Sequence, residues 1–401
     1  MVNVVGLGYI GLPTALMLAA HGVSVVGTDI DRETVERLNS GETTFREDGL
    51  DELLAAAVKN GIRFTTEYCS TDIYIVSVPT PYDPVTKRVD PTYVVSAVGQ
   101  VLRVAPKGAI LVIESTVSPG TIDRYVRPLI SENGFSADEI HLAHAPERIL
   151  PGNMLSELKS NARTIGADDP QIGERVRKLY ATFCEGTIVL TDIVTAEMTK
   201  VIENTYRAVN IAFANELMML CRHEGMDVHE ILRICNMHPR VNILSPGPGV
   251  GGHCIPIDPW FLVGDFGERM PLVNAALKVN DGMPEFVFSR ICEEMRANGI
   301  DDFSKVGLYG LTYKENVDDV RRSPTLQLLA AHPEQFRVYD PMIHKPIVDN
   351  QMFDFAEFCN ACAMIVVMVG HDEIKSDDGW MAGKTILDTR NVCCGENVAR
   401  L

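Results

Sequence analysis

The sequence has no apolar run long enough to span a membrane and no excess of positive charge. No stretch of about 18 apolar residues occurs in the 401-residue chain, so we expect no transmembrane helix. An apolar run opens the sequence with no basic segment before it, so we also expect no signal peptide. The formal net charge of −18 argues against nucleic acid or an anionic membrane as a partner. A small anionic ligand would need a local cluster of Lys and Arg.

Two cysteine patterns are also missing. The ten cysteines lack the regular spacing of a disulfide framework, and no pair of Cys-x-x-Cys motifs indicates zinc. We therefore expect reduced thiols, a cytoplasmic location and no metal site. The length indicates two or three domains, and apolar residues make up 46% of the chain, enough for large cores.

Apolar runs alternate with helical segments at both ends of the chain. The runs at residues 2–5, 23–28, 73–78 and 109–113 predict a parallel sheet covered by helices on both faces. The runs at 305–309, 336–339, 364–369 and 385–388 repeat that pattern. The predicted fold class is α/β, with two Rossmann-like, doubly wound parallel-sheet domains. The alternative is that any α/β domain would give such a pattern.

The middle of the chain is helical. No Pro or Gly interrupts residues 194–224, and a second helical stretch near 272–298 is interrupted around Gly282. Between them lies a loop rich in Gly and Pro, residues 245–259, and such loops are often functional. We therefore predict domains at residues 1–190, 191–300 and 301–401, the central one joining the other two through its long helices.

A glycine motif near the N-terminus predicts a dinucleotide site, because it follows a strand and opens a helix. It consists of Gly6, Leu7, Gly8, Tyr9, Ile10 and Gly11. The free N–H groups at the helix start would bind the phosphates. Asp29 ends the second strand, where its carboxylate favours NAD over NADP, although Arg32 weakens that preference. The alternative is a glycine-rich turn without a ligand.

Thr80 and Thr116 follow later strands of the same predicted sheet. They should therefore lie at its carboxyl edge, where open α/β sheets bind ligands.

Cys254 is the candidate nucleophile. The glycines at 247, 249, 251 and 252 would let a substrate and a nicotinamide approach its sulfur. Asp258, four residues further on, would orient a water molecule or a basic partner. The alternative roles for Cys254 are a metal ligand and an inert buried thiol.

Lys200, Asn204 and Arg207 are spaced i, i+4 and i+7, so they share one face of the long predicted helix. Small or apolar neighbours such as Ala208 and Ile211 indicate a buried helix, and a polar strip there suits a phosphorylated or polyhydroxyl ligand. The alternative is a solvated face.

Over nearly its whole length the chain resembles the UDP-glucose/GDP-mannose dehydrogenases. The resemblance rests on the glycine motif with Asp29, residues 114–121, Pro146-Glu147-Arg148, Lys200 with Asn204, the Cys254 loop, and residues 310–314 and 318–324. It implies an N-terminal NAD domain, a central dimerisation region and a C-terminal UDP-sugar domain. It also implies a homodimer formed through the central helices, and a four-electron oxidation that uses two NAD⁺ per sugar.

The resemblance also assigns residues to roles. Cys254 would form a thiohemiacetal and then a thioester, Lys200 and Asn204 would stabilise the oxyanion, and Asp258 and Glu147 would assist proton transfer and water. The remaining assignments are Thr116 to catalysis, Thr80, Thr116 and Arg321 to the cofactor, and Arg148, Ile149, Lys200, Asn204, Arg207, His238, Arg240, Gly251, Tyr313 and Lys314 to the UDP-sugar.

The chain departs from the UDP-glucose enzymes next to the nucleophile. Ile257 replaces their usual Lys, and His253 replaces a small residue. Residues 236–244 and 258–261 resemble the branch that oxidises UDP-N-acetylmannosamine. UDP-N-acetylglucosamine and UDP-glucose remain alternative substrates. A two-electron β-hydroxyacid dehydrogenase and a catalytically silent nucleotide-sugar sensor are alternative functions.

Overall fold

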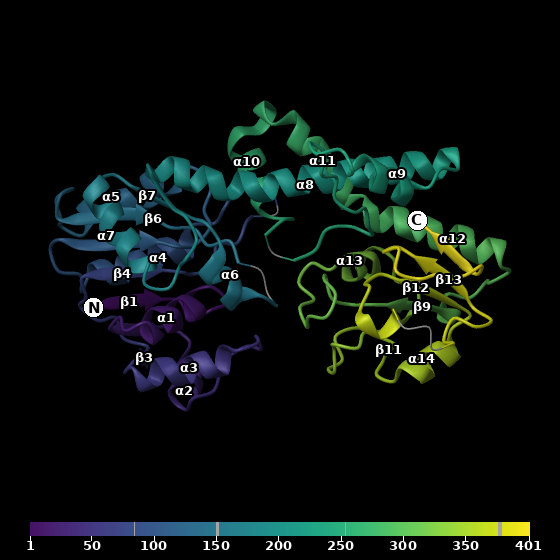
Figure 1. Cartoon of the computed structure of the whole chain (residues 1–401), viewed down its shortest axis with the longest axis horizontal. Helices are drawn as coiled ribbons and strands as arrows, with labels where there is room; N and C mark the ends of the chain where they lie inside the picture. The colour runs from purple at the N-terminus through teal and green to yellow at the C-terminus, as the bar shows by residue number, and fades with distance from the viewer. Residues whose placement is uncertain (84, 150–151, 253, 376–378) are drawn as a thin grey trace. The chain divides into compact units, whose positions relative to one another are not determined.

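The chain folds into two compact units, shown in a computed structural model that describes residues 1–83, 85–149, 152–252, 254–375 and 379–401 (Figure 1). Unit 1 comprises Met1–Glu203 and Trp260–Asp265, and unit 2 comprises Asn204–Pro259 and Phe266–Leu401.

Unit 1 is built on an eight-stranded sheet in the order β3-β2-β1-β4-β5-β6-β7-β8. The strands are β1 (Val2–Val5), β2 (Val25–Thr28), β3 (Arg63–Thr65), β4 (Ile73–Val76), β5 (Ala109–Ile113), β6 (Ile140–His144), β7 (Arg163–Ala167) and β8 (Ile188–Thr191). The central strands are rich in Val and Ile and are buried, because helices cover both faces of the sheet.

The prediction of a parallel sheet holds for β1 to β6, but β7 runs antiparallel to β6. The connection between these strands remains at the carboxyl edge of β6, so β7 starts there and runs back. The pairing joins Ala143 to Ala167 and His144 to Gly166. Extended beyond the ladder, this register places Glu147 opposite Arg163.

Two apolar cores lie on the two faces of the first sheet. One contains side chains of α1 (Gly11–Ala20), α2 (Arg32–Asn39), α3 (Leu50–Lys59), α6 (Met154–Ser160) and α7 (Pro170–Tyr180). The other contains side chains of α4 (Thr92–Leu102), a π-helical turn (Ile122–Val126) and α5 (Arg127–Glu132). Alternate strand residues enter opposite cores, Val4 the first and Val5 the second.

Unit 2 contains a six-stranded sheet in the order β11-β10-β9-β12-β13-β14, and all its pairings are parallel. Its strands are β9 (Val306–Tyr309), β10 (Arg337–Tyr339), β11 (Gln351–Met352), β12 (Met364–Val367), β13 (Thr385–Asp388) and β14 (Val398–Arg400). Helices α12 (Met283–Ala297) and α13 (Pro324–Ala331) contribute to the core on one face, and α14 (Phe355–Ala361) to the core on the other.

The predicted central helices are present. Helix α8 (Ile193–Glu224) is 32 residues long and continues from unit 1 into unit 2 at Asn204. It is followed by α9 (Val228–Cys235), α10 (Asp258–Phe266) and α11 (Pro271–Asp281), and α12 starts after Gly282, where an interruption is expected from the sequence. In the part of the chain that the structure describes, no helix is long and apolar enough to cross a membrane.

Both sheets have the strand order of dinucleotide-binding folds, in which the third, second and first strands precede the fourth, fifth and sixth. The order reverses between β1 and β4 in unit 1, and between β9 and β12 in unit 2. A side chain on Gly6 (φ +90°) would meet the Ser77 carbonyl oxygen at 2.4 Å, and one on Gly310 (φ +101°) would meet Val369 at 2.6 Å. Glycine thus permits the close approach of two loops at each reversal point.

Candidate active site

The glycine motif of unit 1 leaves room for a pyrophosphate. A Cβ on Gly11 would lie 1.9 Å from the Gly6 carbonyl oxygen, so α1 packs tightly against the turn. A Cβ on Gly8 would meet nothing within 4 Å, so the space above the turn is open. No side chain caps the start of α1 at Ile10, which leaves backbone N–H groups for phosphate oxygens. These features fit a bound dinucleotide.

The other residues predicted to bind the cofactor lie around this turn. Asp29 directly follows β2, and its carboxylate accepts hydrogen bonds from Leu7 N at 2.7 Å and Asp31 N at 2.9 Å. The ring of Tyr9 stacks on Phe45 with 4.4 Å between centroids. The Thr80 hydroxyl donates to the Thr116 carbonyl oxygen at 2.6 Å, which joins the loops after β4 and β5.

Glu147, predicted to assist proton transfer, lies in a buried cluster of charges. Its carboxylate pairs with Arg163 and accepts a hydrogen bond from Arg148 N at 2.6 Å. Arg163 also lies 3.7 Å from the Glu114 carboxylate and 4.2 Å from the Tyr180 ring centroid. The Tyr180 hydroxyl donates to Glu114 at 2.9 Å. In any catalytic role, Glu147 would therefore act while paired with the Arg163 guanidinium.

The two residues after Glu147 differ in their surroundings. The Arg148 guanidinium donates to the Ala162 carbonyl oxygen at 3.2 Å and to the Thr164 hydroxyl at 2.7 Å, and it lies 3.1 Å from the Glu203 carboxylate on α8. The side chain of Ile149 packs in the apolar core, so only its backbone is left to contact a ligand. Lys200, one turn before Glu203, is buried.

In unit 2 the nucleophile candidate adjoins two predicted catalytic groups. Asp258 begins α10, and its backbone N–H donates to the Cys254 carbonyl oxygen at 2.8 Å. The Asn204 amide donates to the buried Asp258 carboxylate at 2.6 Å. Because an amide nitrogen carries two protons, Asn204 retains a second donor after this bond. His253 lies outside the described residues.

The loop of residues 311–323 packs against the glycines before Cys254. A Cβ on Gly251 would meet Tyr313 Cβ at 2.5 Å, and Gly252 N donates to the Arg321 carbonyl oxygen at 2.8 Å. Burial raises the pKa of Tyr313 to about 12, and the nearby Asp319 and Cys254 add to the increase. The positive charge of Arg207 lowers the pKa of Tyr313, so Arg207 also lies near this ring.

Four basic residues that the sequence predicts for the site have different surroundings in unit 2. Arg321, predicted for the cofactor, is paired with the Asp319 carboxylate at 2.6 Å. Lys314 is exposed. His238 and Arg240 are also exposed, on a turn after α9 where Arg240 N donates to His238 Nδ1 at 3.3 Å. Contact of these two residues with the UDP-sugar stays a prediction.

Two arginines near the candidate site were not predicted from the sequence. Arg163 is the first residue of β7 and is almost completely buried. Arg390 follows β13, and a side chain on Gly247 of the Cys254 loop would come within 2.6 Å of its guanidinium. Its place after a parallel strand is the signal that identified Thr80 and Thr116 in the first sheet.

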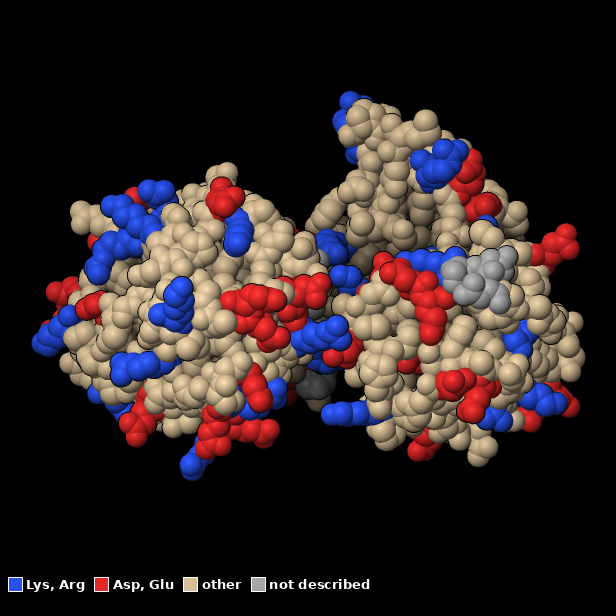
Figure 2. Space-filling model, turned by 60° about the horizontal axis from the view of Figure 1, so that its bottom comes forward, with Lys and Arg blue, Asp and Glu red and all other residues tan. Residues whose placement is uncertain are grey.

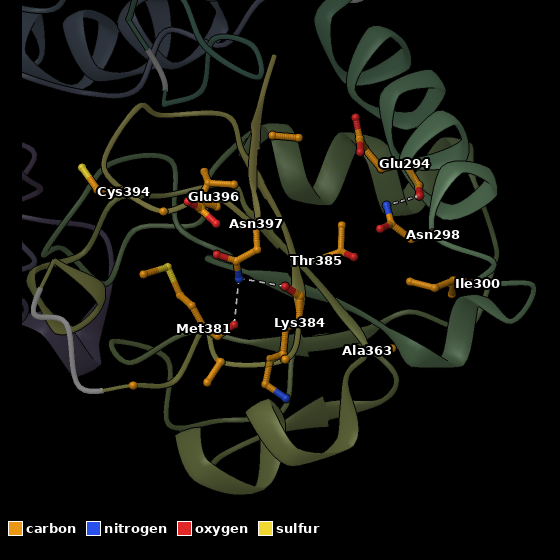
Figure 3. Close-up of a pocket in the computed structure, with 16 residues that line it drawn as sticks. Glu294, Asn298, Ile300, Ala363, Met381, Lys384, Thr385, Cys394, Glu396 and Asn397 are labelled. Carbon is orange, nitrogen blue, oxygen red and sulfur yellow. Dashed lines mark hydrogen bonds between the residues drawn. The ribbon is translucent and has the colours of Figure 1, made fainter.

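Among the described residues, the surface charges and the remaining cavity do not indicate a second site. Acidic and basic side chains are interspersed over the face shown in Figure 2, without one broad basic patch. Among the described residues, no group of three or more His, Cys, Asp or Glu side chains is placed to hold a metal. A cavity of about 840 Å³ in unit 2 lies where β13 and β14 begin (Figure 3), and no described residue of the Cys254 loop lines it. There the Asn397 amide donates to the Met381 and Lys384 carbonyl oxygens.

Sequence models of one protein family match most of the chain. Sequence models of the UDP-glucose/GDP-mannose dehydrogenase family match at residues 1–184 for the NAD binding domain, 194–282 for the central domain and 307–394 for the UDP binding domain. The chain belongs to this family. Membership confirms the predicted enzyme class, an NAD-dependent UDP-sugar dehydrogenase, and the predicted cofactor.

Individual relatives are similar over nearly their full length. A UDP-N-acetyl-D-mannosamine dehydrogenase of Methanococcus maripaludis is 40% identical over 97% of this chain and 92% of its own. An NDP-N-acetyl-D-galactosaminuronic acid dehydrogenase of Ralstonia nicotianae is 38% identical over 99% and 97%. The structure of a UDP-D-ManNAc dehydrogenase from Pyrococcus horikoshii superposes with a TM-score of 0.93 at 34% identity, covering 100% of this chain and 99% of that one.

We expect Glu114→Gln to change how stability depends on pH. Burial raises the pKa of Glu114 from 4.5 to about 7, against the opposing charge of Arg163. The folded chain thus keeps a proton that the unfolded chain releases. The stability from that proton is complete below pH 4.5, and it is lost as the pH rises to about 7. Glutamine cannot ionise, so the variant should gain about 1–3 kcal/mol relative to the parent chain between about pH 5 and 8.

Denaturant unfolding of both proteins across this pH range measures the effect. The exposed Glu132→Gln is the matched control, and its curve should stay parallel to that of the parent chain. If the Glu114→Gln curve also stays parallel, Glu114 is ionised throughout and the buried cluster carries a different charge.

Proposed function

We propose that the chain oxidises C6 of UDP-N-acetyl-D-mannosamine to a carboxylate and so makes UDP-N-acetyl-D-mannosaminuronate, a precursor of cell-surface polysaccharide. The observation that carries this proposal is the constellation of Cys254, Asp258 and Asn204 beside Tyr313. It supplies a nucleophile, a carboxylate and an amide donor in one place. The ten cysteines are free thiols, which fits the cytoplasmic location expected from the sequence.

The chemistry proceeds through a covalent enzyme intermediate. NAD⁺, when bound, accepts the hydride in each of two oxidations. After the first oxidation turns the C6 alcohol into an aldehyde, the Cys254 thiolate adds to the carbonyl carbon and gives a thiohemiacetal. The second oxidation converts this adduct into a thioester. Water then attacks the thioester carbon, the C–S bond breaks, and the carboxylate and free thiol are released.

The neighbouring groups would assist these steps. The remaining N–H of the Asn204 amide and the Lys200 ammonium would stabilise the oxyanion that forms when sulfur or water adds to the carbonyl. Asp258 holds the Asn204 amide at 2.6 Å and would accept a proton from water. Glu147 would act on water in the same way, from its position beside the Arg163 guanidinium. Thr116 would contribute from the carboxyl edge of the first sheet.

The choice of sugar rests on residues near the nucleophile and on the relatives. Ile257 removes the charge that UDP-glucose enzymes carry there, and an apolar wall would suit an acetamide methyl group. The mannosamine dehydrogenases of Methanococcus maripaludis and Pyrococcus horikoshii agree with this preference. UDP-N-acetylglucosamine and UDP-glucose are the alternative substrates.

We also propose that the protein is a homodimer formed through α8. The apolar side chains of Tyr206, Phe213 and Leu220 are 61%, 49% and 52% exposed, and their seven-residue spacing places them along one face of the helix. A second copy of α8 would bury this face.

We expect Phe213→Asp to yield monomers in sedimentation experiments, whereas Phe353→Asp, at an equally exposed site, should leave the dimer intact. A dimer that survives Phe213→Asp would place the interface elsewhere.

The nucleophile is tested by Cys254→Ser. The serine hydroxyl is a far weaker nucleophile than a thiolate, and the ester it would form hydrolyses more slowly than a thioester. We therefore expect uronate formation to fall at least about 10³-fold, while UDP-sugar still binds. NADH release and the acid product are measured together. Uronate formation at a near-parental rate by the serine variant would rule out the covalent route.

The substrate is tested by kinetics with three purified UDP-sugars. UDP-N-acetyl-D-mannosamine should give the highest kcat/KM and two NADH per sugar. UDP-glucose should be poorer by up to about 10⁴-fold, because a site built for an acetamide leaves buried polar groups unpaired without it. A preference for UDP-glucose would contradict the acetamido assignment. A preference for UDP-N-acetylglucosamine would change only the stereochemistry at C2.

A further inference from the structure

The loop of residues 311–323 occupies the reversal point of the second sheet. It follows β9, and open α/β sheets bind ligands between the loops at such a point. The loop carries Tyr313 and Lys314, and it packs through Tyr313 and Arg321 against the glycines before Cys254. Its conformation therefore determines where these side chains lie relative to the nucleophile.

Hydrogen bonds inside the loop define its shape. Tyr313 N donates to the Asp319 carbonyl oxygen at 3.0 Å, and the Asp319 carboxylate accepts from Arg321 N at 3.0 Å. A loop with such internal bonds still needs attachment to the sheet. Asp340, at the end of β10, provides it near the loop's start by accepting from Leu311 N at 2.6 Å and Thr312 N at 3.0 Å.

His371 provides a second attachment from the loop after β12, across the reversal point. It is 1% exposed, and its Nδ1 accepts a hydrogen bond from Asn316 N at 3.0 Å. Because Nδ1 accepts, the ring proton must be on Nε2. That atom lies 3.3 Å from the Asp340 carboxylate and 3.2 Å from the Thr312 hydroxyl. The hydroxyl donates to the Lys314 carbonyl oxygen at 2.9 Å, so it can accept from His371.

The attachment at Asn316 is reinforced by the residue's own geometry. Asn316 has φ +57°, a conformation that asparagine adopts more readily than most residues. Its side-chain oxygen accepts from Asp372 N at 3.1 Å. Both the backbone and the side chain of Asn316 are thus hydrogen-bonded to the segment that contains His371.

We propose that His371 is a positioning residue for UDP-sugar binding, which holds the loop at Thr312 and Asn316 so that Tyr313 and Lys314 are preorganised for the substrate. A buried imidazole fits this task because Nδ1 accepts and Nε2 donates on opposite sides of one ring. Without it, the loop would have to become ordered when the substrate binds, and affinity would fall. The inference rests on the proposed function, in which this loop contacts the UDP-sugar.

The test compares His371→Leu with His371→Asn. Leucine fills the space but offers no hydrogen bond, whereas the asparagine side-chain oxygen takes the place of Nδ1 and can accept from Asn316 N. We expect His371→Leu to raise both the KM for UDP-N-acetyl-D-mannosamine and the Kd for UDP about tenfold. Most residues predicted to bind NAD⁺ lie in unit 1, and Arg321 keeps its pair with Asp319 in this variant, so the KM for NAD⁺ should change less than about twofold. His371→Asn should restore most of the UDP affinity.

A second variant acts from the surface in case His371→Leu does not fold. Asn316→Ala removes the bond to Asp372 and disfavours the positive φ, so it should shift the same N–H away from His371. It should likewise raise the KM for the UDP-sugar and not that for NAD⁺. An unchanged UDP-sugar KM in the folded variants would overturn the proposal. An equal rise in both KM values would do so too, because it would indicate a general loss of structure.

Lys314→Ala separates this proposal from the proposed function. If Lys314→Ala leaves the Kd for UDP unchanged, the loop does not bind the nucleotide and the assignment of the substrate site fails. If Lys314→Ala weakens UDP binding and His371→Leu does not, the substrate site stands and only the positioning role of His371 fails.

Discussion

The guanidinium of Arg163 lies where water cannot solvate it, so its charge has to be balanced, and the Glu147 carboxylate pairs with it. Removing one partner of such a buried pair typically costs about 3–5 kcal/mol, because the other charge is left uncompensated. The pair joins the start of β7 to the loop after β6. Since Glu147 also accepts from Arg148 N, the same charge balance fixes the backbone from which Arg148 reaches α8. Much of the carboxyl edge of unit 1 thus depends on one buried cation.

The two sheets use one structural device for different purposes. In each sheet an aspartate at the end of the second strand accepts a hydrogen bond from the loop after the first strand: Asp29 from Leu7 N and Asp340 from Leu311 N. Asp29 remains partly exposed and is available to a ribose. Asp340 is buried, and despite that burial the hydrogen bonds from His371 and backbone N–H groups hold its pKa below the ordinary value. The aspartate that is predicted to face a ligand in the first sheet thus corresponds to a buried loop anchor in the second.

Apolar periodicity and glycine placement are enough to predict both sheets, the long helix and the loops that carry the candidate site. They do not encode strand direction, so the reversal at β7 was missed, and with it the register that places Glu147 opposite Arg163. Nor does a motif reveal exposure: His238 and Arg240 match a family pattern but lie on an open turn. His371 and Arg390 follow parallel strands, and only the strand order of the second sheet shows that both lie at its carboxyl edge.

The charge of the chain explains why anchored loops matter here. With a net charge of −18, the long-range field of the protein repels a negatively charged UDP-sugar, although salt screens that repulsion beyond about 8–10 Å. Binding free energy would then have to come from short-range contacts, and the arginines of unit 2 near the candidate site are Arg207, near Tyr313, and Arg390, near Gly247. Arg321 is already neutralised by Asp319. Contacts of this kind depend steeply on geometry, so their value is set by how rigidly the protein holds the loops before the ligand arrives.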